Sequence, residues 1–161
     1  MLKSSRFHRS GQYTGTPFDL VVLDHQERHL RRRRISLVHE DSVMVDLPST
    51  VLLEHGDVLE LDDGRLVEVI AAEETLHEVT GHNARELAEL AWHIGNRHLA
   101  AQIEERRILI LCDPVIRDML LGLGAHVREV SEPFHPARGA YSGHAHDHGH
   151  GHDHHHGHSH D

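Results

Sequence analysis

Histidines dominate the end of the chain, where they make up ten of the last eighteen residues among Gly, Asp, Ser and Ala. A neutral imidazole offers one lone-pair nitrogen suited to Zn²⁺, Cu²⁺ and Ni²⁺, and alternate residues of an extended segment lie on one side, so several can share an ion. The run is broken by Gly and acidic residues, unlike a purification tag. We expect residues 142–161 to be a flexible metal-binding tail with these ligands: His144, His146, His148, His150, His152, His154, His155, His156, His158 and His160.

A few further residues outside this tail could bind metal. His98 lies just beyond the end of a predicted helix, where a surface or interface histidine is the plainest interpretation. His93 is about 140° away from it around that helix, so we interpret it as structural. Cys112 is the one cysteine, which excludes an intramolecular disulfide; after the apolar residues 108–111 it is predicted to be a buried core thiol, with thiolate metal binding as the alternative. For His135 the sequence favours neither a ligand nor a structural role.

Catalytic motifs are missing from the sequence. It contains no nucleophile elbow, phosphate-binding loop or HExxH motif, and no spacing singles out a general acid and base. We therefore expect a binding protein and not an enzyme.

Charge and hydropathy limit the partners. The formal net charge is −10, no aromatic residues interleave with the Arg31–Arg34 run, and no apolar stretch approaches the roughly 18 residues of a membrane helix. The arginine run is interpreted as a solvated strand edge or a contact for an acidic protein, with no nucleic acid and no membrane as partner. The N-terminus lacks the apolar segment of a secretory signal, and we expect a cytoplasmic protein.

Residues 1–74 show short apolar runs rich in Val and Leu, separated by turn signals, and are predicted to form a β-rich domain. The clearest hairpin pairs residues 58–61 with residues 66–69. Asp63-Gly64 is expected to supply the positive φ angles of a tight turn between them.

Residues 75–141 show the pattern strand, helix, strand, strand, helix, strand, which predicts a ferredoxin-like βαββαβ domain and an α+β protein overall. The first helix has its apolar residues at helical spacing, with Asn83 and Glu86 as capping pair and Gly95 as left-handed C-terminal cap. Asp113 and Pro114 are expected to open the second helix, which Gly122 and Gly124 close.

The segment WHIGNRH, residues 92–98, and the pattern GDxLxxxDGRLVxV at residues 56–69 together resemble the UreE family of urease accessory nickel chaperones. So do DPVIRDMLLGLG, PFHPARGAYSG and the histidine-rich end. The resemblance implies a homodimer with a peptide-binding-like first domain, in which one His98 from each chain holds a single Ni²⁺ at the interface. Some members carry a further His-x-His pair where this chain has Cys112 and Pro114, and that pair is lost here.

The function expected from this resemblance is delivery of Ni²⁺ to apo-urease during assembly of its active site, with the urease maturation complex and the accessory GTPase UreG as partners. Storage or buffering of nickel or zinc through the tail is the main alternative, and peptide binding by the β-rich domain is a third. Isolated imidazoles bind Cu²⁺ more tightly than Ni²⁺, and Zn²⁺ competes closely, so the tail does not define the metal. The sequence leaves open how many ions the tail binds, which tail histidine completes the His98 site, and whether the protein is a dimer or a tetramer.

Overall fold

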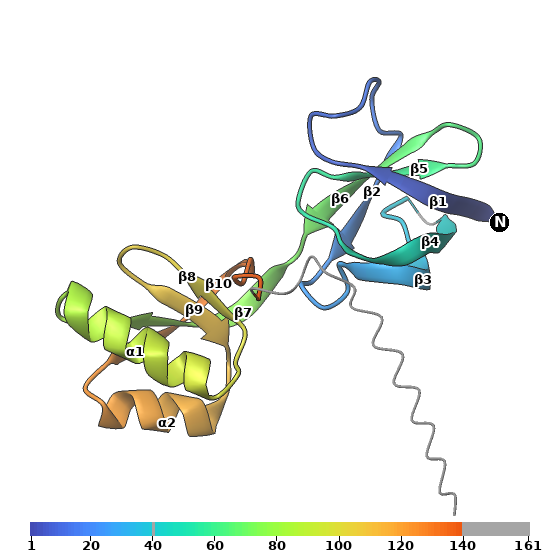
Figure 1. Cartoon of the computed structure of the whole chain (residues 1–161). Helices are drawn as coiled ribbons and strands as arrows, with labels where there is room; N and C mark the ends of the chain where they lie inside the picture. The colour runs from blue at the N-terminus through green and yellow to red at the C-terminus, as the bar shows by residue number, and fades with distance from the viewer. Residues whose placement is uncertain (40, 140–161) are drawn as a thin grey trace, which may run out of the picture.

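A computed structural model describes residues 1–39 and 41–139, which form two sheets and two helices (Figure 1). We call strands β1–β6 the six-stranded unit, and strands β7–β10 with both helices the four-stranded unit. The sheet of the six-stranded unit has the order β2-β6-β5-β1-β4-β3, and β1–β4 and β2–β6 are its parallel pairs. Its strands are β1 (Leu2–His8), β2 (Asp19–Leu23), β3 (His29–Ser36), β4 (Ser42–Leu52), β5 (Val58–Leu61) and β6 (Leu66–Ala71).

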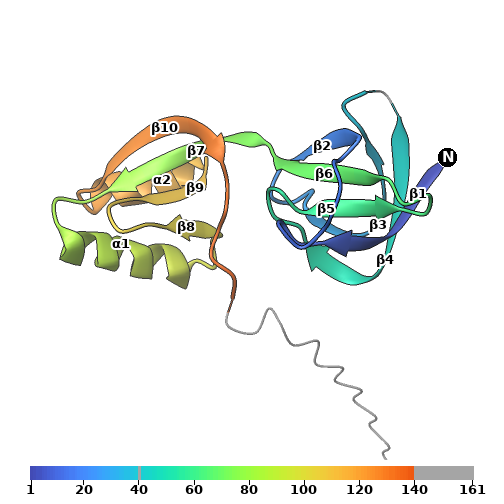
Figure 2. The same cartoon turned by 90° about the horizontal axis from the view of Figure 1, so that it is seen from above.

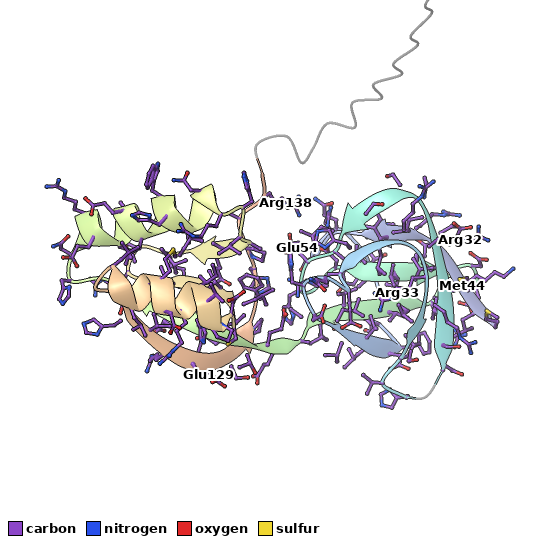
Figure 3. All side chains as sticks on the ribbon, turned by 90° about the horizontal axis from the view of Figure 1, so that it is seen from below. Arg32, Arg33, Met44, Glu54, Glu129 and Arg138 are labelled. Atoms are coloured by element: carbon purple, nitrogen blue, oxygen red, sulfur yellow. The ribbon has the colours of Figure 1, made fainter. Side chains whose placement is uncertain are left out.

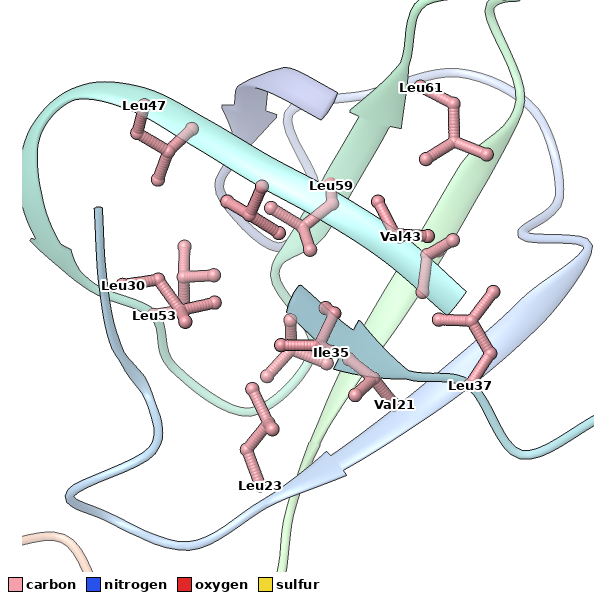
Figure 4. Packing of buried hydrophobic residues seen from close by; sticks show 13 residues of the cluster. Val21, Leu23, Leu30, Ile35, Leu37, Val43, Leu47, Leu53, Leu59 and Leu61 are labelled. Carbon is pink, nitrogen blue, oxygen red and sulfur yellow. The ribbon is translucent and has the colours of Figure 1, made fainter. Parts of the chain in front are cut away.

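The six-stranded unit curls around one apolar cluster (Figure 4). Along β4 the buried residues Val43, Val45 and Leu47 alternate with more exposed ones, because successive side chains of a strand point to opposite faces. Leu30 from β3 and Leu59 from β5 meet them and are fully buried. The Val- and Leu-rich runs of the sequence are therefore the inward faces of the strands.

The predicted hairpin is confirmed as β5 and β6, but its turn differs from the expectation. Only Gly64 has a positive φ, at 86°, and Asp63 does not. The amide of Gly64 donates to the Leu61 carbonyl and the Leu61 amide to the Arg65 carbonyl, both at 2.8 Å, which leaves a three-residue loop. This is a turn followed by a left-handed glycine bulge, not the two-residue turn that we expected.

The four-stranded unit has the element order β7, α1, β8, β9, α2, β10, as the sequence predicts. Its antiparallel sheet has the order β10-β7-β9-β8, and both helices cover the same face (Figure 2). This is the ferredoxin-like arrangement. The elements are β7 (Glu73–Thr80), α1 (Ala84–Asn96), β8 (Ala101–Ile103), β9 (Ile108–Leu111), α2 (Pro114–Gly122) and β10 (His126–Pro133).

The two helices start as the sequence predicts. The Asn83 side chain accepts from the Glu86 amide at 2.9 Å, and the Asp113 side chain accepts from the Val115 and Ile116 amides at 2.8 and 3.1 Å. The Glu86 carboxylate, however, accepts from His82 and not from Asn83, so the reciprocal half of the capping box is displaced by one residue. The caps satisfy amides that have no partner within the helix.

The two units meet around a buried arginine. Arg28 is 1% exposed, and its guanidinium donates to the carbonyl of Phe134, just after β10, at 2.6 Å. Near it, Arg138 forms an ion pair with Glu54 at 2.7 Å across the junction (Figure 3). These contacts supplement the chain connection between β6 and β7 in holding the units together.

Arg31–Arg34 lie on β3, the last strand of its sheet in the part of the chain described here, and all four are exposed. The strand-edge interpretation is confirmed. No helix among residues 1–39 and 41–139 is both long and apolar enough to span a membrane.

Candidate metal centre

His98 occupies the reversal that ends α1. The helix runs through Gly95 to Asn96, Arg97 is its C-cap, and the His98 amide donates to the Gly95 carbonyl at 3.0 Å. The prediction of Gly95 as left-handed cap is therefore wrong, because the positive φ belongs to His98, at 56°. The following residue, Leu99, packs against the core that includes Ile94, and the chain must turn there to bury it.

The end of α2 shows the same motif with the expected residue. Leu123 is the C-cap, Gly124 has a φ of 87°, and the amides of Gly124 and Ala125 donate to the carbonyls of Leu121 and Leu120. Glycine takes this left-handed position without steric strain, whereas a residue with a Cβ does not. His98 is the only non-glycine residue with a positive φ in the described residues, and this places a strained backbone at a candidate ligand.

The imidazole of His98 is open to a ligand. The residue is exposed, and no described group forms a hydrogen bond with its ring. Its backbone is fixed by the helix end on one side and by partly buried Leu99 on the other, so the side chain extends from a defined Cβ position. A ligand held this way loses less conformational freedom when it binds an ion.

His93 is half-buried and its ring contacts that of Trp92, with centroids 5.0 Å apart. Trp92 itself is 64% exposed. Ile103, on the edge strand β8, is 58% exposed. Two large apolar side chains are thus exposed on a helix and on an edge strand of the same unit.

Cys112 does not have the environment that we predicted. The thiol is exposed at the end of β9, so the interpretation as a buried core residue is wrong. The first three residues of β9, Ile108, Leu109 and Ile110, are buried, but the strand ends at exposed Leu111, just before Cys112. Partial desolvation and the charge of Glu129 raise the pKa of the thiol, which disfavours the metal-binding thiolate.

His135 lies in the segment between the two units. Its amide donates to the side-chain oxygen of Gln102 at 2.9 Å. Desolvation, followed by the charge of Arg28, lowers the pKa of the imidazole. The lowered pKa favours the neutral ring, which is the form that binds metal. No group of three or more metal-binding side chains forms around it in residues 1–39 and 41–139, so its role stays open.

No cluster of three or more His, Cys, Asp or Glu side chains that could hold one metal ion occurs in residues 1–39 and 41–139 of a single chain. The ten expected tail ligands, His144 to His160, lie outside the described residues. His98 is thus not part of a site with three or more ligands within the described residues of one chain.

His25 and His29 are two histidines that our sequence analysis did not consider. Their ring centroids are 4.9 Å apart on the turn that joins β2 to β3. The spacing of four residues in HQERH, which brings two side chains together over one helical turn, was the signal that could have found them.

Comparisons with known proteins cover nearly the whole chain. A family model described as UreE urease accessory protein, N-terminal domain, matches residues 6–72, and a second, described as its C-terminal domain, matches residues 74–161. The chain is similar to proteins named urease accessory protein UreE from Agrobacterium fabrum, 55% identical over 91% of this chain and 93% of the relative, and from Rhizobium rhizogenes, 54% identical over 92% and 89%. Urease accessory protein UreE 1 of Brucella suis is 59% identical over 79% and 78%.

Proposed function

The chain belongs to the UreE family of urease accessory proteins, and from this premise we propose that it binds Ni²⁺ and delivers it to apo-urease while the urease active site is assembled. Family membership makes it an accessory protein of urease maturation, and we infer from this role that it is not an enzyme. The proposal of a nickel carrier adds the metal and the direction of transfer. Ni²⁺ is here the cargo, and a carrier needs ligands that can release it.

The observation that carries the proposal is the position of His98. Its exposed imidazole stands on a backbone that the helix end and partly buried Leu99 hold in a strained conformation. Strain of this kind persists where the surrounding structure imposes it, and it is concentrated at functional sites. An imidazole is also a suitable ligand for Ni²⁺.

One histidine provides too few ligands for a tight metal site. We propose that a homodimer supplies a second ligand, the His98 of the other chain. A two-fold axis duplicates every residue near it, so one histidine per chain becomes a pair. Exposed Trp92, on the helix that ends just before His98, and exposed Ile103, on the edge strand β8, support an interface on this side of the four-stranded unit. The tail would complete the coordination of the ion.

The tail is proposed to collect Ni²⁺ and to raise its concentration beside the His98 pair, because a tethered ligand acts at a high effective concentration. We propose the accessory GTPase UreG as the docking partner within the maturation complex, and the cytoplasm as the location. We propose the division into residues 1–74, 75–141 and 142–161. Because β6 ends at Ala71 and β7 starts at Glu73, the change from one sheet to the other falls at residue 72, two residues before the first of these boundaries.

Calorimetric titration with Ni²⁺ tests the proposal. The chain ended after Gly143 keeps all three apolar clusters, and it is expected to bind one tight ion per two chains, with its dimeric state checked by light scattering. His98→Ala should abolish this binding. His93→Ala, in the helix that ends just before His98, is the matched control and should keep the tight Ni²⁺ binding. Absence of tight binding to the shortened chain would instead favour storage by the tail as the function.

A further inference from the structure

Strand β3 has a neighbouring strand on one side only. In the described residues it ends the order of its sheet and pairs with β4 alone (Figure 1). Just beyond the strand the edge is closed, because the Val38 amide donates to the Leu20 carbonyl of β2 at 2.9 Å. At the other end the register shifts between Leu30 and Arg32, and pairing with β4 is regular from Arg32 to Ser36. These five residues span about 17 Å, and their outer amides and carbonyls are open to a further strand.

Three arginines of this edge are distributed over both faces of the sheet. Arg33 lies opposite Val45, which faces the core, and residues directly opposite each other in a sheet share a face. Arg32 and Arg34, one residue to either side, therefore share the outer face. All three side chains are exposed, and Arg32 and Arg33 are labelled in Figure 3. Two guanidinium groups thus lie at alternate positions on the outer face, and the third reaches past the edge itself.

These guanidinium groups lack the close carboxylate partners that other arginines of the chain have. Arg33 forms one long ion pair with Glu27, at 3.4 Å, and Arg34 donates to a serine hydroxyl at 3.0 Å. Arg32 has no hydrogen bond or ion pair with a described residue, although Asp46 lies opposite it. A carboxylate within 3.0 Å is found at several arginines elsewhere: Arg9, Arg65, Arg107, Arg128 and Arg138. With 26 acidic residues in the chain, the unpaired arginines of β3 do not result from a shortage of carboxylates.

An extended acidic segment fits this edge in two ways. Its backbone can add a strand to β3, and its alternate side chains then project to the outer face, where Arg32 and Arg34 lie. A guanidinium group binds a carboxylate through two parallel hydrogen bonds, and opposite charges that face each other across a strand pair stabilise the pairing. Backbone pairing alone would accept any extended chain, so the arginines select for carboxylates at alternate positions.

A nucleic acid fits the same edge less well. It has no peptide groups to pair with the open amides and carbonyls of β3. No aromatic residues interleave with the arginines to stack on bases, and the formal net charge of −10 opposes the approach of a polyanion. The chemistry of the edge therefore favours a protein partner.

We propose that the free edge of β3 binds an extended segment of a partner protein as an additional strand, with Asp or Glu at alternate positions opposite Arg32 and Arg34. This interaction goes beyond the proposed function, because it involves neither Ni²⁺ nor His98. It gives the six-stranded unit a part in recognising a partner, whereas the four-stranded unit carries the proposed metal ligand.

Binding of a synthetic peptide to the full chain tests the proposal, with a chelator present so that metal plays no part. In the peptide four glutamates alternate with four threonines, and both ends are blocked. Fluorescence anisotropy measures its dissociation constant, and nuclear magnetic resonance follows hydrogen exchange of the backbone amides. We expect binding that weakens as the salt concentration rises, and slower exchange of those amides in Arg32–Ser36 that are not bonded to β4.

Two double variants separate the edge from the overall charge. Arg32→Gln/Arg34→Gln should weaken binding of the peptide roughly fivefold to tenfold, because two charge pairs across the strands are lost. Arg85→Gln/Arg117→Gln removes the same charge from exposed positions on α1 and α2, and should leave the dissociation constant unchanged within about a factor of two at physiological salt. A peptide with glutamine in place of every glutamate should bind more weakly than the acidic one.

Several results would overturn the proposal. Failure of the acidic peptide to bind, or equal binding of the glutamine peptide, would remove the role of charge. Equal weakening by both double variants would mean that the peptide senses only the overall charge. Binding without slower exchange in β3 would place the peptide on a face of the sheet and not at its edge. Tighter binding of a single-stranded DNA oligonucleotide would favour a nucleic acid as the partner.

Discussion

At position 98 a glycine should make the protein more stable than an alanine does, whereas inside α1 a glycine should make it less stable than an alanine does. His98 has a φ of 56° at the position that Gly124 occupies after α2. Ala88 is an exposed residue of α1 and is the matched control. Comparing His98→Gly with His98→Ala isolates the backbone, because the imidazole is absent from both variants.

The magnitudes follow from the two conformations. A left-handed backbone costs a residue with a Cβ roughly 1–2 kcal/mol, and glycine loses about 0.5–1 kcal/mol more conformational entropy on folding. His98→Gly should therefore be more stable than His98→Ala by about 0.5–1 kcal/mol. Ala88→Gly has no strain to relieve and should lose about 1 kcal/mol relative to the unaltered chain.

Urea unfolding, followed by circular dichroism with a chelator present and at one protein concentration, measures both differences. With a slope of about 2 kcal/mol per molar urea, the midpoint should rise by about 0.3–0.5 M from His98→Ala to His98→Gly, and fall by about 0.5 M for Ala88→Gly. A midpoint that falls at both positions would refute the reasoning, since it would mean that residue 98 is not left-handed in solution.

Three other perturbations have defined outcomes. Arg107→Gln should cost about 2 kcal/mol at pH 7, because it removes hydrogen bonds of 2.7 and 2.8 Å to Glu132 together with bonds of 3.0 Å to Glu78 and to Glu104. Arg107 lowers the pKa of the Glu132 carboxyl, so this stabilisation is present above the ordinary glutamate pKa of about 4.3 and is lost as the pH falls further; urea midpoints of both proteins should converge in acid. Asp113→Ala should cost about 1 kcal/mol in the same assay through loss of the α2 cap, and Asp113→Asn should recover most of it. Cys112 is exposed but has a raised pKa, so iodoacetamide should alkylate it more slowly at neutral pH than it does a free cysteine, and equal rates would contradict the part assigned to Glu129.

Much of the fold follows from local signals in the sequence. Asp113-Pro114 marks the start of α2 and Gly124 its end because each residue type solves one backbone problem: an amide without a partner, a fixed φ, and a left-handed reversal. The alternation along β4 likewise shows its inward face.

The exceptions depend on tertiary packing, which a local pattern does not contain. Gly95 has the sequence signal of a cap, but the reversal falls three residues later, where burial of Leu99 requires it. Cys112 follows an apolar run, but the strand leaves the core just before it. In each case the position at which the chain turns could not be read from the residue type.

The site could be predicted only in part, for a related reason. His98 was found through its motif, and its strained backbone could not be read from residue type, since histidine has no preference for that conformation strong enough to indicate it. The approach of Phe134 to His25 joins residues more than a hundred positions apart. Such a contact depends on how the two units pack, although the four-residue spacing of His25 and His29 was visible.

The arginines of β3 affect whether copies of this chain aggregate through their sheet edges. A strand at the end of a sheet exposes unpaired amides and carbonyls, to which the edge of another molecule can add as a further strand. Four neighbouring guanidinium groups on that edge make such an approach repulsive for an identical copy. The metal sharing that we propose for the histidine-rich tails would draw copies together, and the charged edge would keep those encounters reversible and prevent them from growing into extended sheets.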